Sequence, residues 1–237
     1  MDYVVSVFAL SRLGYTPLCL SLRIPPPAIL NLLRLTGCHI LIHGSSSAIS
    51  EKVAAVVSQH STTCLPLPSR QDYDLGDADL GPRFERSFDR EVENLLPALI
   101  MHSSGSTGLP KPVTLSHRAV LTHAIQGAGL DNFNPLPWHH MYGVSVCLQA
   151  MYRAKTANMY SSTLPLTAEN LAATVRQVRP DAIHVVPYAL GLLSETPEGV
   201  AHLKSAKTVT SAGAKTPDEL GDRLVSEGVN LALVFGT

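Results

Sequence analysis

Apolar positions repeat along the chain with two different periods, and together these periods predict an α/β fold. Apolar residues recur every three or four positions in segments such as 2–13, the spacing of a helix with one buried face, whereas compact apolar runs such as 39–43 are typical of strands. Because the two kinds of segment alternate, we expect parallel or mixed sheets with flanking helices. For residues 1–128 the pattern predicts helices over 2–13, 26–37, 47–59 and 116–128, and strands over 17–20, 39–43, 64–67 and 98–101.

The same alternation continues to the end of the chain, after one interruption. Residues 69–93 carry charges of both signs with little apolar periodicity, which favours a solvated connector over an acidic binding patch. We therefore predict two α/β lobes, residues 1–68 and 98–237, joined by a connector over 69–97. The second lobe is expected to contain helices over 143–152, 168–178, 188–195 and 218–226, and strands over 156–160, 182–186, 208–210 and 231–235.

Composition narrows the class of protein. The 237 residues are 45% hydrophobic and 16% charged, with a formal net charge of −1, which is the profile of a globular protein. Lys and Arg are not clustered as nucleic-acid binding requires, and no apolar run approaches the ~20 residues that cross a bilayer. The four cysteines contain no CxxC pair, so a disulfide framework is not indicated. We expect a cytoplasmic protein that binds neither nucleic acid nor membrane.

The chemically most informative segment is residues 103–111, Ser-Ser-Gly-Ser-Thr-Gly-Leu-Pro-Lys, directly after the predicted strand 98–101. Two glycines, Gly105 and Gly108, allow the backbone to bend tightly and approach a ligand. Hydroxyl groups and one positive charge suit phosphate oxygens, and they come from Ser103, Ser104, Ser106, Thr107 and Lys111. The spacing is wrong for a Walker loop, and no dinucleotide fingerprint or nucleophile elbow is present, which disfavours a kinase or a hydrolase. A flexible polar loop without function is the simpler alternative.

The residue order of 103–111 resembles the phosphate loop of the adenylate-forming (AMP-binding) superfamily, which includes acyl-CoA synthetases, luciferases and adenylation domains of nonribosomal peptide synthetases. One residue departs, because Pro112 stands where the family has glycine, which removes a backbone donor and stiffens the end of the loop. Other segments resemble family motifs in the family's order: 13–21, 137–143, 211–214 and 233–237. Residues 186–190 and 220–225 are most similar to fungal synthetase-like carboxylic acid reductases, in which adenylation, carrier and reductase domains share one chain.

The resemblance implies a reaction in which a carboxylate attacks the α-phosphate of ATP with the help of Mg²⁺. A thiol then takes the acyl group, as the phosphopantetheine of a carrier domain would. Residues implied to hold ATP are Ser103, Ser104, Gly105, Ser106, Thr107, Gly108, Lys111, Gly213, Ala214, Phe235, Gly236 and Thr237. Those implied to border the carboxylic acid are His139, His140, Met141, Gly143 and Ala212. His140 and Lys111 are the implied catalytic residues.

Two absences refine this expectation. Family members that load α-amino acids usually carry an Asp in the segment that corresponds to residues 138–142, and here that segment has no acid. An unpaired buried ammonium is costly, so we expect an aryl, keto or other non-amino acid. The histidines do not suggest a metal site, because His39 and His43 would lie ~13 Å apart on a strand and His139–His140 lacks a third ligand. His184 is expected to be a hydrogen-bonded interior residue.

The resemblance also implies that the family fold extends beyond both ends of this sequence. The carboxylate that holds Mg²⁺ in the family would follow Thr237, as would the small C-terminal domain with its lysine. We therefore expect a fragment that contains part of the large N-terminal domain, ends inside the nucleotide site and is inactive alone. The alternative is a non-catalytic remnant that binds nucleotide weakly.

Overall fold

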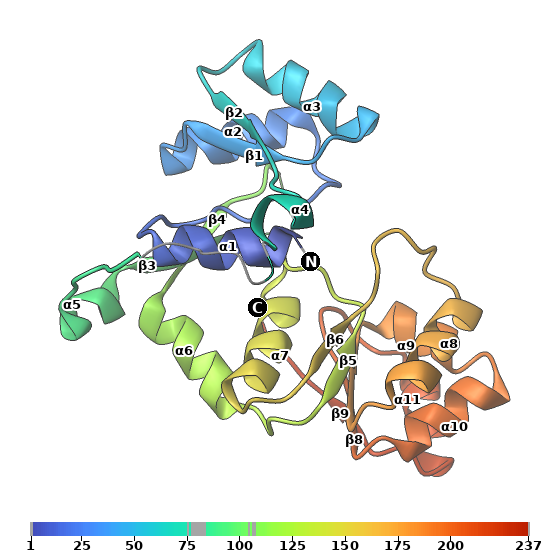
Figure 1. Ribbon diagram of the computed structural model, residues 1–237. Coiled ribbons are helices and arrows are strands. Elements are labelled where there is room, and N and C mark those ends of the chain that lie inside the picture. The colour runs from blue at the N-terminus through green and yellow to red at the C-terminus, as the bar shows by residue number, and fades with distance from the viewer. Residues whose placement is uncertain (1, 75, 77–83, 104, 106–107, 237) are drawn as a thin grey trace. The chain divides into compact units, whose positions relative to one another are not determined.

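The computed structural model describes residues 2–74, 76, 84–103, 105 and 108–236, which fold as two compact units (Figure 1). The units are Met1–Val120 and Leu121–Thr237. Contacts therefore divide the chain after Val120, whereas the charge pattern predicted the connector at 69–97. The physical reason is backbone pairing within the first unit: Ile100 N–H donates to Pro17 O at 2.9 Å, and Cys19 N–H donates to Ile100 O at 2.8 Å.

The first unit contains two small sheets and the helices around them. Strands β1 and β2 pair in parallel, whereas β3 and β4 are antiparallel. The predicted strand over 17–20 is reduced to a bridge between Leu18 and Ile100. The elements are α1 (Asp2–Arg12), α2 (Pro26–Thr36), β1 (Ile40–His43), α3 (Ser47–Val57), β2 (Thr63–Pro66), α4 (Arg70–Tyr73), α5 (Arg90–Leu95), β3 (Pro97–His102) and β4 (Pro112–Ser116), followed by α6 (His117–Gln126).

Helix α2 supplies most of the residues of an apolar core in this unit. It begins at Pro26, where the missing N–H of proline has no helical partner to lose, and it ends at Gly37, whose φ of 62° suits the left-handed cap. Its apolar face packs against α3 and the segment before the helix. The buried residues of this core are Ile24, Ala28, Ile29, Leu30, Leu32, Leu33 and Val56.

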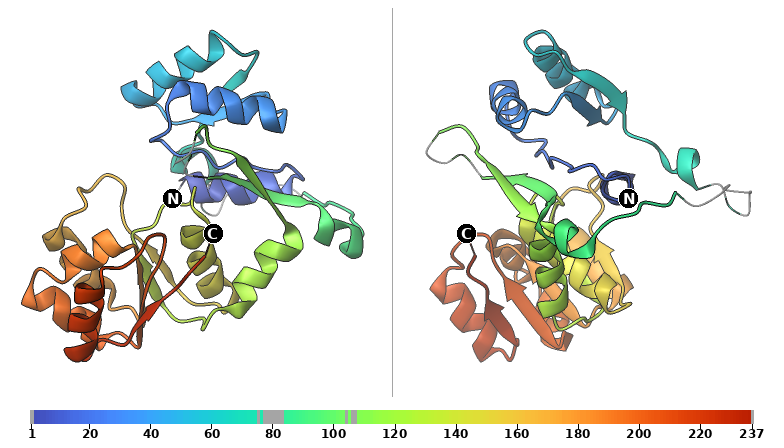
Figure 2. Two further views of the ribbon diagram at one scale, coloured as in Figure 1. Left: turned by 180° about the vertical axis from the view of Figure 1, so that it is seen from behind. Right: turned by 90° about the vertical axis from the view of Figure 1, so that its left-hand side faces the viewer.

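The second unit is a five-stranded parallel sheet in the order β6-β5-β7-β8-β9, which confirms the predicted parallel α/β architecture. Helix α7 lies on one face of the sheet and α8–α11 lie on the other (Figures 1 and 2). The elements are β5 (Asn132–Asn134), α7 (Met141–Tyr152), β6 (Ala157–Met159), α8 (Ala168–Val178), β7 (Ala182–Val185), α9 (Pro187–Leu193), α10 (Pro197–Ser205), β8 (Thr208–Ser211), α11 (Asp218–Ser226) and β9 (Leu231–Leu233).

The two faces of this sheet differ in polarity. Successive strand residues point to opposite faces, so Phe133, Ile183 and Val209 join the apolar core under α8–α11. Except for Ala182, the alternate positions in the same strands are polar, and they face α7. They are Asn132, Asn134, His184, Thr208 and Thr210. The strands therefore build an apolar core on one side and a hydrogen-bonding layer on the other.

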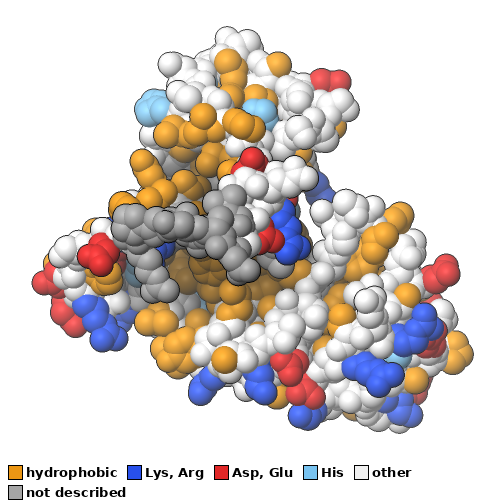
Figure 3. Space-filling view, in the orientation of Figure 1, with side chains coloured by type: hydrophobic (Ala, Val, Ile, Leu, Met, Phe, Trp, Pro, Cys, Tyr) orange, Lys and Arg blue, Asp and Glu red, His pale blue; other side chains and the backbone are white. Residues whose placement is uncertain are grey.

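Charged side chains are spread over the surface that Figure 3 displays, where Lys and Arg occur in small groups with Asp and Glu beside them. In the described part of the chain, no helix combines the length and apolar character that crossing a membrane requires.

Candidate functional site

Strand order in the second unit places a ligand-binding position at the carboxyl ends of β5 and β7. The chain runs from β5 outward to β6, then returns to β7 on the other side of β5 and continues to β8 and β9. The connections that leave β5 and β7 therefore diverge over opposite faces, and open α/β sheets bind ligands at such a divergence. The connection after β5 contains His139 and His140. Two of the residues predicted to border the substrate thus lie where the topology favours a site.

A tight turn presents His140 at the start of α7. The His140 N–H donates to Pro137 O at 3.1 Å, and the His140 carbonyl accepts the first helical hydrogen bond from Val144 at 3.2 Å. Gly143 permits this turn, because a Cβ there would lie 2.6 Å from Pro137 O. The His140 side chain is exposed, and its ring centroid lies 4.5 Å from that of His139.

The base of the turn is anchored in the interior. Trp138 is buried and its Nε1–H donates to Cys147 Sγ at 3.3 Å, while Asn134 Nδ2 donates to the same sulfur at 3.5 Å. Asn132, on the same face as Asn134, donates from Nδ2 to Val146 O of α7 at 2.8 Å. Helix α7 is therefore tied to β5 through side-chain amides, which fixes the direction in which its first turn points.

Beside that first turn, three polar side chains form a cluster that sequence reasoning did not assemble. The Tyr142 hydroxyl donates to Thr210 O at 3.2 Å and also contacts Thr210 Oγ1. His184 Nδ1 lies 2.6 Å from the same Oγ1, and the His184 and Tyr142 rings meet edge to face with centroids 6.3 Å apart. We call Tyr142, His184 and Thr210 the polar cluster. His184 is hydrogen-bonded as predicted.

Burial keeps the polar cluster uncharged near neutral pH. Loss of hydration lowers the pKa of His184 to about 4 and raises the pKa of Tyr142 to about 12, an increase that the hydrogen bond to Thr210 partly offsets. At neutral pH the cluster therefore offers hydroxyl and imidazole groups without a net charge.

The low pKa of His184 predicts a loss of stability in acid. Unfolded histidine binds a proton near pH 6.5, whereas folded His184 does so only near pH 4, so the free energy of unfolding falls as pH drops between those values. The full loss from this residue is about 3 kcal/mol. Urea unfolding at pH 7.0, 5.5 and 4.5 should show a shallower pH dependence in His184→Gln than in the wild type. Replacement of the exposed His123 by Gln is the control and should leave the slope unchanged.

The carboxyl ends of β8 and β9 lead into residues implied to hold ATP, namely Gly213, Ala214, Phe235 and Gly236, and into Ala212, which is implied to border the carboxylic acid. Ala212 is buried and its N–H donates to Val185 O at 3.2 Å, while Gly213, with a φ of 88°, turns the chain outward. Gly213, Ala214 and Gly236 are exposed, and Phe235 has 93% of its surface accessible. Thr237 lies outside the described residues. These positions lie at the carboxyl ends of the parallel strands, as do His139 and His140.

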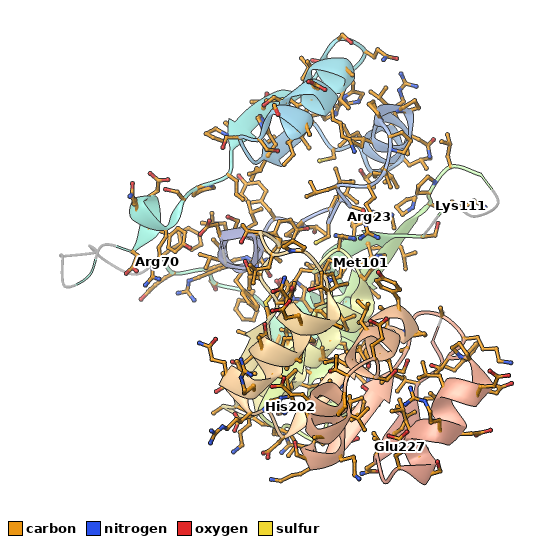
Figure 4. All side chains as sticks on the ribbon, turned by 90° about the vertical axis from the view of Figure 1, so that its right-hand side faces the viewer. Arg23, Arg70, Met101, Lys111, His202 and Glu227 are labelled. Carbon is orange, nitrogen blue, oxygen red and sulfur yellow. The ribbon has the colours of Figure 1, made fainter. Side chains whose placement is uncertain are left out.

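The predicted phosphate loop, residues 103–111, belongs to the first unit and connects β3 to β4. Its two ends pair, because Ser103 N–H donates to Lys111 O and Lys111 N–H donates to Ser103 Oγ, both at 3.0 Å. Gly105 needs to be glycine, since its φ is 74° and a Cβ would lie 2.7 Å from Gly108 O. Lys111 is exposed where the chain leaves the loop (Figure 4). Ser104, Ser106 and Thr107 lie outside the described residues.

No metal centre is found where the structure can be described: no three His, Cys, Asp or Glu side chains are grouped to hold an ion.

A surface hollow lies elsewhere in the second unit, between the end of α9, α10 and the end of α11. Helices that follow strands of a parallel sheet end beside the strands' amino ends. That hollow therefore lies near the amino ends of the strands, whereas His139 and Ala212 lie near their carboxyl ends.

Comparison with known proteins agrees with the residue pattern. The family model described as AMP-binding enzyme matches residues 1–237. The adenylate-forming reductase stbB of Stachybotrys bisbyi is 29% identical over 244 residues, which cover 99% of this chain and 23% of the reductase. The non-canonical nonribosomal peptide synthetase ascB of Acremonium egyptiacum is 30% identical over 248 residues, covering 99% of this chain and 22% of the synthetase. The chain therefore spans less than a quarter of the length of these relatives.

Solved structures share the fold over the whole chain. The luciferase-like enzyme of the mealworm Zophobas morio superposes with a TM-score of 0.79 at 16% identity, covering 100% of this chain and 57% of that one. ATP-bound MatB of Rhodopseudomonas palustris gives a TM-score of 0.76 at 17% identity, covering 100% of this chain and 47% of that one. The likeness predicted from residues 103–111 and the later segments, including that to fungal synthetase-like reductases, is confirmed.

Proposed function

The chain belongs to the AMP-binding enzyme family, and on that premise we propose that it is part of an enzyme that activates a carboxylic acid as an acyl-adenylate. The family uses ATP. The observation that carries the proposal is the position of the predicted substrate residues. They follow the carboxyl ends of β5 and β8, on the side of the sheet where the connections that leave β5 and β7 diverge. In this reaction a carboxylate oxygen bonds to the α-phosphorus of ATP, and the bond from that phosphorus to the pyrophosphate oxygen breaks.

Both reactants are anions, so the proposed roles of the residues are charge neutralisation and alignment. We assign the β- and γ-phosphates of ATP to the ammonium group of Lys111 and to the loop that precedes it, residues 103–108. We assign the reacting carboxylate to His140, whose exposed imidazole can donate a hydrogen bond to an anionic oxygen. The adenine would be bordered by Gly213, Ala214, Phe235, Gly236 and Thr237, and the acyl group by His139, Met141, Gly143 and Ala212.

Mg²⁺ assists this reaction in the family, but the described residues do not fit it. In the described part of the chain, no three His, Cys, Asp or Glu side chains are grouped to hold an ion, and the segments assigned to ATP contain no carboxylate side chain. We therefore assign the metal no ligand and no step. The likeness to a nonribosomal peptide synthetase supports the phosphopantetheine thiol of a carrier domain as the acceptor of the acyl group. We also propose a cytoplasmic location.

The polar cluster supports a non-amino acid as the substrate. Its members are uncharged at neutral pH, and residues 138–142 contain no carboxylate that could pair with an ammonium group. A hydroxyl or carbonyl group on the acid would be compatible with such surroundings, since these groups need hydrogen bonds rather than a counter-charge. We propose an aryl or keto acid, or another acid without an α-amino group.

Equilibrium binding to this chain tests the proposed function without requiring turnover. Isothermal titration calorimetry is expected to detect ATP binding and no comparable binding of GTP, because the family to which the chain belongs uses ATP. A Gly105→Val variant should bind ATP more weakly than the wild type, since its Cβ would meet the Gly108 carbonyl. Equal affinity for GTP and ATP, or no binding of either, would contradict the proposal.

A further inference from the structure

The two ends of the phosphate loop are both attached to helix α2 and the turn that leads into it. At the first end, His102 is buried at the end of β3, and its Nε2 accepts the Ser21 N–H at 3.1 Å. Because Nε2 accepts, the neutral imidazole carries its proton on Nδ1, which lies 2.9 Å from Ser103 O and donates to it. One side chain thus connects the start of the loop to Ser21.

At the second end, Asn31 makes the equivalent attachment. This half-buried residue of α2 donates from Nδ2 to Pro110 O at 3.2 Å, across 79 positions of sequence. Pro110 immediately precedes Lys111, whose N–H is held by Ser103 Oγ at 3.0 Å. The backbone of Lys111 is therefore located by one bond from the helix and one from the opposite end of the loop.

Ser21 and Asn31 are linked by a hydrogen-bonded turn that leads into α2. The Ser21 hydroxyl accepts the Arg23 N–H at 3.2 Å, and Ile24 N–H donates to Ser21 O at 3.4 Å, so the chain turns directly into α2. The helix is then fixed by its buried apolar face. Contacts at Ser21 and Asn31 consequently hold the loop ends at a set separation.

We propose that His102 and Asn31 are positioning residues that hold Ser103 and Lys111 on α2, and so strengthen the binding of the triphosphate without contacting it. This inference rests on the proposed function. Its physical basis is pre-organisation: a loop whose ends are fixed before binding loses less conformational freedom when the ligand arrives.

Substitutions that remove one attachment at a time test the inference on this chain. Asn31→Leu keeps the size of the side chain and removes its donor, and His102→Phe removes both imidazole bonds. His102→Gln retains an acceptor near the Nε2 position, so it should recover part of any loss. Arg34→Ala changes an exposed residue of the same helix and is the control. Amide hydrogen exchange at Ser103 and Lys111 is measured without nucleotide, and the Kd values for ATP and adenosine are measured by calorimetry.

In Asn31→Leu we expect severalfold faster exchange at Lys111, about tenfold weaker ATP binding and unchanged adenosine binding. Arg34→Ala should match the wild type in all three. Unchanged exchange or unchanged ATP affinity in Asn31→Leu would overturn the inference, and so would a parallel loss of ATP and adenosine binding, which indicates general destabilisation. If the wild type binds no ATP, the proposed function fails, and exchange at Lys111 alone decides whether Asn31 holds the loop. If His102→Phe does not fold, the half-buried Asn31 still carries the test.

Discussion

Replacing Lys111 with alanine is expected to weaken ATP binding by about 10- to 100-fold and to leave adenosine binding nearly unchanged. The Lys111 backbone is held by its bonds with Ser103, so truncation removes the ammonium group while the loop ends stay paired. A hydrogen bond to a charged group contributes about 1.5–3 kcal/mol, and the phosphate oxygens would keep their charge without this partner. Calorimetric Kd values for ATP, AMP and adenosine, measured at constant ionic strength, give the comparison.

Two further variants show whether the weaker ATP binding of Lys111→Ala comes from the loss of its ammonium group at that position. Lys111→Arg keeps the positive charge and should retain more ATP affinity than Lys111→Ala, although the guanidinium differs in shape and length. Lys204→Ala removes an exposed charge of α10 and leaves the net charge equal to that of Lys111→Ala, so it controls for long-range electrostatics. Equal weakening by the two alanine variants, or equal weakening of ATP and adenosine, would show that Lys111 does not hold the phosphates.

Periodicity predicted most of the elements because most of them have one clearly apolar face. It missed elements whose local pattern is weak. Strand β5, Asn-Phe-Asn, has a single apolar residue, and its asparagines are stabilised by α7, which no local pattern reveals. Strand β4 begins at Pro112, a residue that argues against a strand except at such a first position. Helix α10 was missed although Thr196 caps it and Pro197 opens it, signals that precede a short and only moderately apolar segment.

The candidate site was predicted as separate segments and not as a set of contacts. The predicted phosphate loop and the His139–His140 segment have restrictive residue orders, so both could be proposed by reading along the chain. The polar cluster could not, because its contact depends on β7 and β8 pairing with His184 opposite Thr210. A local signal did exist in β5 and β8, where polar residues occupy alternate positions, and β7 has one polar residue, His184. The attachment of Asn31 to Pro110 has no local signal, since tertiary packing brings the two residues together.

An α-amino group on the bound acid should weaken binding strongly. We expect 3-phenylpropanoyl-sulfamoyladenosine to bind this chain about 100-fold more tightly than phenylalanyl-sulfamoyladenosine. These two stable analogues of an acyl-adenylate differ only in the α-amino group. At pH 6.5 that amine is protonated, whereas the pKa of His184, lowered to about 4 by burial, keeps its imidazole neutral. The ammonium group would thus lose hydration without gaining a counter-charge from residues 138–142.

A carboxylate introduced into that segment should reverse the preference. Met141 is half-buried in the first turn of α7, so Met141→Asp places a negative charge beside Tyr142, and Met141→Asn provides a neutral side chain of the same shape. We expect Met141→Asp to bind the phenylalanyl analogue at least tenfold more tightly than Met141→Asn does, because only Asp supplies the missing charge. Competition calorimetry with both analogues and all three proteins measures these affinities.

A wild-type chain that binds the phenylalanyl analogue as tightly as its amine-free partner would refute the assignment of a non-amino acid. Equal affinities of the Asp and Asn variants for the phenylalanyl analogue would show that residue 141 does not face the acyl group.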